Sequence, residues 1–287
     1  MPRSFAVLAA LMAGALGACA TPVDSRAAVI RLDGQWRLGE MEAGSFEQLV
    51  DAIRDVGAQP ADDPARVLAV PELLRVVVGN PSAWVRHEAL RAAWKLSSGL
   101  PAAGAVREDP LDRADFNTRT QRLEQIVLED GDASSTEALD LARWLAGLRV
   151  PYEEVELSVS VAEVVVSQSL WRTDALGQAF HDGLAGSLQH ALALVTLRAS
   201  TDAGPVVREE ALRSVRHLHP EAALSLVAGV LARETDSAVV LAALDSLGAL
   251  APQLQPDALA AVLGGLRDSP DVAVRAQVRA LLEPAAG

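Results

Sequence analysis

The residues with the most suggestive chemistry are His87 and Glu88, which are adjacent in the sequence. Imidazole nitrogens and carboxylate oxygens both bind transition metals, but one of each does not fill an octahedral iron site. A metal centre would need further ligands from the positions that match this pair later in the chain. Those positions hold Glu209-Glu210, Ala242-Ala243 and Ala276-Gln277, with no histidine among them. We therefore interpret His87 and Glu88 as surface residues at a helix start, and we predict no metal, no cofactor and no catalytic residue.

The other histidines do not form a chelating pattern. His217 and His219 are two residues apart, so on a helix their side chains would point about 200° apart. His217 would instead lie at a helix C-terminus, where a positive charge is stabilised. His181 and His190 are nine residues apart across a segment that contains glycines. The sequence also lacks a G-x-S-x-G nucleophile motif and a phosphate-binding loop.

The single cysteine, Cys19, ends an apolar N-terminal segment. Residues 5–16 form an uncharged run of the length found in export signals. The run closes with the letters LGAC, which resemble the lipobox of bacterial lipoproteins. The resemblance implies a signal peptide over 1–18, cleavage between Ala18 and Cys19, and a diacylglycerol on the cysteine sulfur. A plain secretory signal cut near Ala18, without a lipid, is the alternative.

Acyl chains on Cys19 would hold the protein to a bilayer, because each buried methylene contributes about 0.8 kcal/mol. Ala20 stands where an inner-membrane lipoprotein often carries aspartate, so the enterobacterial sorting pattern implies the outer membrane, facing the periplasm. Proline and several glycines interrupt any helical period over 19–44, and we predict a tether there. Trp36, alone in this segment, is expected to pack back on the first helix.

A repeat of about 33 residues organises the rest of the chain. Val207-Arg208, Val240-Leu241 and Val274-Arg275 are 33 and 34 residues apart, and Val85-Arg86 is a fourth copy. Each follows a polar turn and precedes apolar residues at helical spacing. This helix–turn–helix unit resembles the HEAT-like repeat family, most clearly over 66–97 and 200–283. The resemblance implies an all-α fold, an α-solenoid of stacked helical hairpins over 45–287.

The arginines of this repeat predict a ladder between neighbouring units. Arg86, Arg208 and Arg275 recur at the repeat period, and the turns contain aspartates such as Asp202 and Asp268. We expect each arginine to pair with a turn aspartate, a structural role.

The HEAT-like deoxyhypusine hydroxylase family gives the enzymatic alternative. Its repeats carry His-Glu pairs at the position of His87-Glu88, and those pairs together hold two irons. Three of the four comparable pairs in this chain lack histidine. A metal-dependent enzyme that uses His87 and Glu88 is therefore kept as a second reading.

The middle of the chain is less regular. Residues 98–113 are predicted as a long loop, and 119–129 and 136–148 as helices. Residues 155–161 alternate like a strand, but a helix start at Pro151 favours a helix. A small-molecule or glycan carrier with a pocket between helices of 151–199 is a third reading.

Charge and surface residues favour a scaffold. With 38 acidic and 25 basic residues, a net charge of −13 disfavours nucleic acid as a partner. The second helices of a HEAT-like stack usually line its concave face. Their expected outward residues and flanking tryptophans are Trp84, His87, Arg91, Trp94, Glu209, Arg213, Arg216 and Asp245. Because Trp and Arg are enriched in interface hot spots, we predict a non-catalytic, lipid-anchored scaffold that binds another envelope protein.

Overall fold

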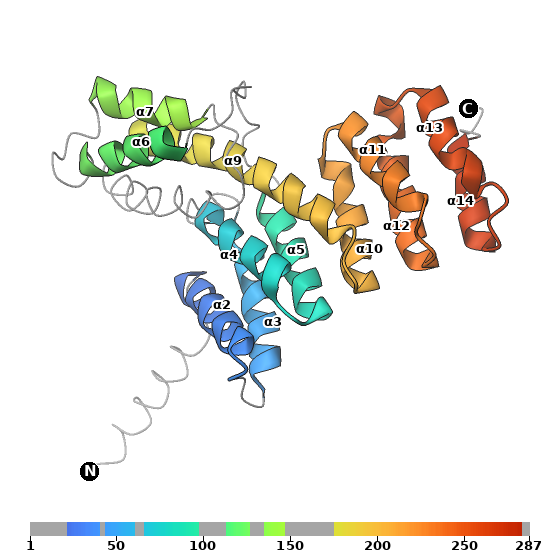
Figure 1. Cartoon of the computed structure of the whole chain (residues 1–287), viewed down its shortest axis with the longest axis horizontal. Coiled ribbons are helices and arrows are strands. Elements are labelled where there is room, and N and C mark those ends of the chain that lie inside the picture. Colours follow the sequence, from blue (N-terminus) through green and yellow to red (C-terminus); the bar gives the residue numbers. More distant parts are fainter. Residues whose placement is uncertain are drawn as a thin grey trace, which may run out of the picture.

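The computed structural model describes residues 22–40, 44–60, 66–97, 113–126, 135–146 and 175–282. Within these ranges all regular structure is helical, so the all-α prediction is confirmed (Figure 1). The signal peptide, Ala18 and Cys19 lie outside the described residues, as does the ambiguous segment 155–161. No described helix is both long and apolar enough to cross a bilayer.

The α-helices of the described residues are α2 (Pro22–Arg37), α3 (Ser45–Val56), α4 (Arg66–Gly79), α5 (Ala83–Ser97), α6 (Arg113–Gln125), α7 (Thr136–Ala146), α9 (Ala175–Ala199), α10 (Pro205–Ser214), α11 (Pro220–Leu231), α12 (Ser237–Leu250), α13 (Pro256–Leu263) and α14 (Val272–Leu282). Short 3₁₀ turns follow α10, α12 and α13, at Val215–His217, Ala251–Gln253 and Gly264–Leu266. The predicted helices over 119–129 and 136–148 overlap α6 and α7, although α6 begins earlier, at Arg113, and the ends of both predicted ranges lie outside the described residues.

The helices form pairs that stack side by side (Figure 1). The second helices of the pairs make one row, in which α3 contacts α5, α5 contacts α10, α10 contacts α12 and α12 contacts α14. Among the first helices, α2 contacts α4, α4 contacts α9 and α11 contacts α13. Each pair buries an apolar stripe against its neighbours, because a single pair has no second layer to cover it.

The pair α4–α5 is the direct neighbour of the pair α9–α10, although α6 and α7 come between them in the sequence. Helix α7 packs on the first part of the 25-residue helix α9 at the side of the stack, and α6 packs on α7 (Figure 1). Helices α6 and α7 are therefore inserted, in the sequence, between two pairs that are direct neighbours in the stack.

The prediction of a tether over 19–44 is wrong for residues 22–37, which form α2. Val29 and Leu32 on this helix are buried in the core. The Trp36 ring packs edge-on against Phe46 of α3, with 5.7 Å between ring centroids. The expected packing of Trp36 on the helix that follows the 19–44 segment is therefore confirmed.

The glycines of this segment led to the wrong prediction of a tether. Two of them lie in the connection between α2 and α3, and the third is accommodated within α2. Gly34 lies within α2, where a Cβ would meet nothing within 4 Å. Gly39 and Gly44 have φ values of 75° and 85° and lie in the connection between the helices. Residues with positive φ favour glycine, so these two glycines allow the chain to turn back at this point.

Three hydrogen bonds, the first of them buried, also hold α2 in place. The Asn80 side-chain amide, in the turn before α5, donates to Asp33 Oδ1 over 2.7 Å. Arg37 donates from Nε to Asp33 Oδ2 and from Nη2 to the carbonyl oxygen of Arg75, each over 2.7 Å. The first helix is thus part of the folded body.

Arginines join neighbouring pairs at their turns. Arg86 donates to the carbonyl oxygens of Asn80 and Pro81 in its own turn, over 2.7 and 2.9 Å. Its Nε and Nη2 donate to both oxygens of Asp202, over 2.9 and 2.6 Å, across to the turn before α10. The predicted pairing of Arg86 with a turn aspartate is confirmed.

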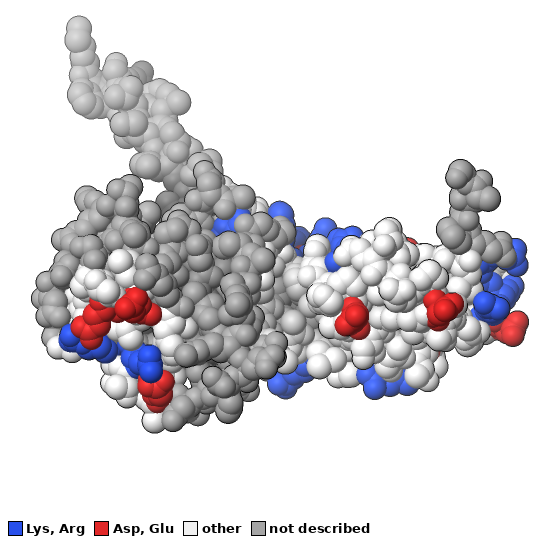
Figure 2. Space-filling view, turned by 90° about the horizontal axis from the view of Figure 1, so that it is seen from above, with Lys and Arg blue, Asp and Glu red and all other residues white. Residues whose placement is uncertain are grey.

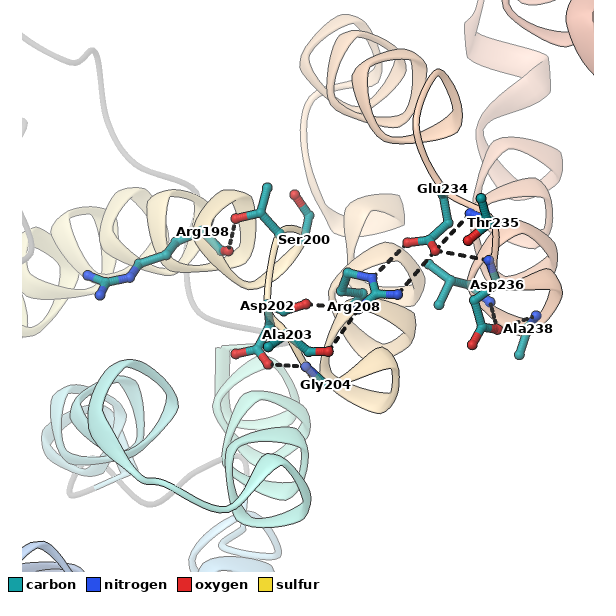
Figure 3. Close-up of polar contacts among 12 residues, drawn as sticks. Arg198, Ser200, Asp202, Ala203, Gly204, Arg208, Glu234, Thr235, Asp236 and Ala238 are labelled. Atoms are coloured by element: carbon teal, nitrogen blue, oxygen red, sulfur yellow. Dashed lines mark hydrogen bonds and ion pairs between the residues drawn. The ribbon is translucent and has the colours of Figure 1, made fainter.

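Arg208 repeats this geometry one unit further along, with a different acidic partner (Figure 3). It donates to the carbonyl oxygens of Asp202 and Ala203, over 2.9 and 3.2 Å, and to both oxygens of Glu234, over 2.7 and 3.1 Å. The expected aspartate is therefore a glutamate, which lies in the turn between α11 and α12. Asp236, two residues on, instead caps α12 by accepting from the Ala238 amide.

Arg275 completes the series at the last pair. It donates to the carbonyl oxygens of Ser269 and Pro270 in its own turn. Within the described residues it has no ion pair with Asp268 or with any other carboxylate. The expected partner from a turn aspartate is therefore not found for Arg275 among the described residues, which end at α14.

The Arg208–Glu234 pair predicts a pH-dependent stability. Hydrogen bonds from Arg208 are the main cause of a Glu234 pKa below its ordinary value of 4.5. The ionised carboxylate therefore stabilises the fold above that value, and the contribution is lost as the pH falls through the lowered pKa. We expect Glu234→Gln to unfold at lower urea concentration than wild type at about pH 7, with the difference shrinking as the pH falls below 4.5. A difference that stays constant over this pH range would contradict this.

Candidate functional site

A groove of about 700 Å³ lies between α5 and α10. We call it the α5–α10 groove; its lining residues are Trp84, His87, Arg91, Trp94, Lys95, Val206, Glu209, Glu210, Arg213, Ser214, Arg216 and His217. Seven of the eight residues expected on the second-helix face are in this set. The structure thus brings together, on two helices that are neighbours only in space, residues that the sequence separates by more than 100 positions.

The eighth residue, Asp245, lies elsewhere. It is exposed on α12 and accepts a hydrogen bond from the Gln277 side chain of α14. Asp245 therefore belongs to the same row of second helices but not to the groove.

Trp94 forms part of the groove wall. Its side chain is 9% exposed, and its indole Nε1 donates to Thr196 Oγ1 over 2.9 Å. The His217 ring stacks on it, with 5.2 Å between centroids and an interplanar angle of 24°. One aromatic side chain therefore links α5, α9 and the turn after α10.

His217 is favoured in its neutral form. Burial lowers its pKa below the ordinary value of 6.5, the Arg216 charge lowers it further, and Glu210 acts in the opposite direction. Arg216 Nε lies 3.4 Å from His217 Nε2, where a neutral imidazole accepts a hydrogen bond. The positive charge expected on His217 at a helix end is therefore disfavoured, because burial and the neighbouring Arg216 charge both lower its pKa.

His87 and Glu88 are buried, at 9% and 5% exposed, so their interpretation as surface residues is wrong. His87 Nε2 lies 3.4 Å from Glu210 Oε2 on α10, and its Nδ1 lies 4.0 Å from Glu88 Oε1. The half-exposed Trp84 ring lies beside the imidazole, at 5.2 Å between centroids. Helix α10 covers this face of α5, and the sequence gives no sign of that contact.

Glu88 faces the opposite side of α5. Arg54 on α3 donates to both of its oxygens, over 2.9 and 3.3 Å. Burial disfavours the charged form of Glu88, but the Arg54 hydrogen bonds and charge outweigh it and leave the pKa below its ordinary value. Glu88 is therefore a structural partner of α3.

The groove contains both paired and unpaired charges. Arg213 forms ion pairs with Glu209 and, at 3.9 Å, with Glu210. Arg91 and Arg216 are exposed, and neither forms an ion pair with a carboxylate of the described residues. The groove thus keeps two arginines that have no carboxylate partner among the described residues.

The described residues contain no group of three or more His, Cys, Asp and Glu side chains placed to hold a metal ion. The carboxylates nearest to His87 are already engaged, Glu88 with Arg54 and Glu210 with Arg213. His219 is exposed at the start of α11, and the His181 side chain is not among those described. The carrier pocket expected over 151–199 falls largely outside the described residues.

Sequence reasoning missed five lining residues: Lys95, Val206, Glu210, Ser214 and His217. Lys95 follows Arg91 by four residues and Glu210 precedes Arg213 by three, so helical spacing from the predicted residues could have found some of them. His217 lies in a 3₁₀ turn after α10, a position that helical spacing does not reach.

Comparison with protein-family models gives no match for the chain, and no curated protein matches its sequence.

Proposed function

We propose that the protein is a lipid-anchored, HEAT-like α-solenoid of the bacterial cell envelope that binds another protein in the α5–α10 groove, without catalysis. The stacked helix pairs and the arginines that recur at their turns support the solenoid reading. The anchoring part of the proposal rests on the lipobox-like segment that ends at Cys19.

The observation that carries the binding role is the composition of the groove. It combines a half-exposed tryptophan, Trp84, with two arginines that lack carboxylate partners, Arg91 and Arg216. Large amphipathic side chains of this kind are enriched in interface hot spots. An anchored protein also meets a partner in the same membrane layer at a raised effective concentration.

The first-helix side supplies a contrasting surface. Figure 2 shows the face over α11 and α13 as mainly uncharged, with isolated acidic groups in view. Its exposed residues include Ala222, Ser225 and Gly229, which are small. This face offers a matched position for a control.

Site-specific photocrosslinking in cells tests the proposal. We expect a benzoylphenylalanine at position 84 to capture a defined protein, and the same probe at exposed position 222 not to capture it. The product should disappear when Cys19→Ala removes the acylated thiol. No product at position 84 from correctly localised protein, or the same products from both positions, would overturn the proposed function.

A further inference from the structure

We propose that the occupant of the α5–α10 groove is an extended acidic segment of the partner that also carries aromatic side chains. The inference rests on the proposed function and names the chemical class of its partner. Three features carry it: the sign of the local charge, the shape of the hollowed surface, and the aromatic rim.

The local charge is opposite to that of the whole chain. The protein has a net charge of −13, yet four cations and two carboxylates line the groove. Both carboxylates, Glu209 and Glu210, already face Arg213. An acidic segment is therefore repelled by most of the protein and attracted here, which is how charge complementarity suppresses wrong partners.

Arg91 and Arg216 provide the recognition chemistry. A guanidinium presents a planar fork of donors that binds a carboxylate through two parallel hydrogen bonds. Arg91 lies on α5 and Arg216 follows α10, so the two forks come from the two elements that line the groove. Carboxylates of one bound segment can thus be held from both elements.

The hollowed surface along which Arg91 lies is too long for a compact ligand. A second hollow of about 310 Å³ lies between α3 and α5, lined by Arg54, Gly57, Glu88, Arg91, Ala92 and Lys95. Arg91 and Lys95 line both hollows, so the surface continues across α5. Neighbouring helices lie about 8–10 Å apart, so the path from α3 to α10 is about 20 Å long, the reach of about six extended residues.

Trp84 accounts for the aromatic preference. It is 44% exposed at the groove and rests on His87, so one part of its indole is available to a partner. Aromatic pairs contribute about 0.5–1.5 kcal/mol beyond the area that they bury. A partner with acidic and aromatic residues in alternation would use the arginines and this ring together.

Fluorescence anisotropy with defined peptides tests the inference on the full-length protein in detergent micelles. The first probe is fluorescein-labelled Gly-Glu-Phe-Glu-Glu-Phe-Glu-Gly. In the lysine peptide each glutamate is replaced with lysine, and in the alanine peptide each phenylalanine is replaced with alanine. We expect the lysine peptide to bind at least about tenfold more weakly than the acidic one. The alanine peptide should bind at least about threefold more weakly than the acidic one. An acidic peptide that binds no better than either counterpart overturns the corresponding part of the inference.

Charge variants assign the binding to the groove. Arg91→Glu with Arg216→Glu should weaken the acidic peptide at least about tenfold, and Arg91→Gln with Arg216→Gln should weaken it less. Arg233→Glu and Arg279→Glu, which change exposed arginines outside the groove, should leave affinity within about twofold. Equal losses in all of these variants would overturn the assignment, as would groove-dependent binding of anionic phospholipid vesicles in place of the peptide.

The outcomes separate this inference from the proposed function. If position 84 still crosslinks its protein in cells carrying Arg91→Glu and Arg216→Glu, the scaffold stands and the acidic class is overturned. If position 84 captures nothing, the proposed function is overturned, whatever the peptides do. Capture in wild type that is lost in the double variant supports both.

Discussion

Replacing Trp94 with alanine is expected to lower the free energy of unfolding by about 4 kcal/mol, the cost of removing a large buried side chain. Trp94 lies on α5, and its indole is 9% exposed. The indole donates a hydrogen bond to Thr196 of α9 and stacks on His217 in the turn after α10, so it joins three elements. Its loss leaves a cavity between α5, α9 and the turn after α10. Urea unfolding followed by far-UV circular dichroism measures the change.

Two further variants separate the parts of this effect. Trp84→Ala changes a tryptophan on the same helix that is 44% exposed, so we expect a loss of less than about 1 kcal/mol. Thr196→Val keeps the shape of the buried threonine and leaves the indole N–H without its acceptor, at a cost of about 1–3 kcal/mol. A Trp94→Ala protein no less stable than Trp84→Ala would show that Trp94 does not hold these helices together.

Replacing Arg86 with alanine is expected to cost about 3 kcal/mol, because it breaks a largely buried ion pair and leaves the other charge in place. Arg86 and Asp202 have side-chain exposures of 14% and 16%, and they are 116 residues apart in the sequence. The guanidinium also satisfies two carbonyl oxygens at its own turn. The same unfolding measurement applies.

Arg275→Ala is the matched control for this change. Arg275 makes the same two contacts with carbonyl oxygens of its own turn but has no described carboxylate partner. Its replacement should cost about 1 kcal/mol, the value of ordinary hydrogen bonds. Equal losses in the two variants would mean that the carboxylate of Asp202 adds nothing to the stack.

The sequence predicts the local part of this fold well. Apolar residues at helical spacing and polar turns before Val-Arg locate α5, α10, α12 and α14, because both signals depend on a few neighbouring residues. Helix α2 was not predicted, because what stabilises it is not visible in a few neighbouring residues. Its burial depends on Asn80 and Phe46, which lie beyond any local window, while its glycines resemble those of an irregular segment.

The groove shows the same division. Helical spacing placed Arg91 and Arg213 on outward faces, but it did not indicate that α5 and α10 touch. That contact depends on how the chain returns after the insertion, and it decides which charges are paired. The burial of His87 and Glu88 follows from the neighbouring helices α10 and α3, so residue type alone gave the wrong exposure for both.

The early start of α2 fixes how far the folded body can stand from its proposed anchor. Two residues separate Cys19 from Pro22, the first residue of α2, and this length of chain spans at most about 10 Å. The pair α2–α3 would therefore lie nearest the lipid. The α5–α10 groove begins one helix beyond α3, about 10 Å along the stack at ordinary helix spacing. A groove so near the proposed anchor would favour partners whose binding segment also lies close to the membrane.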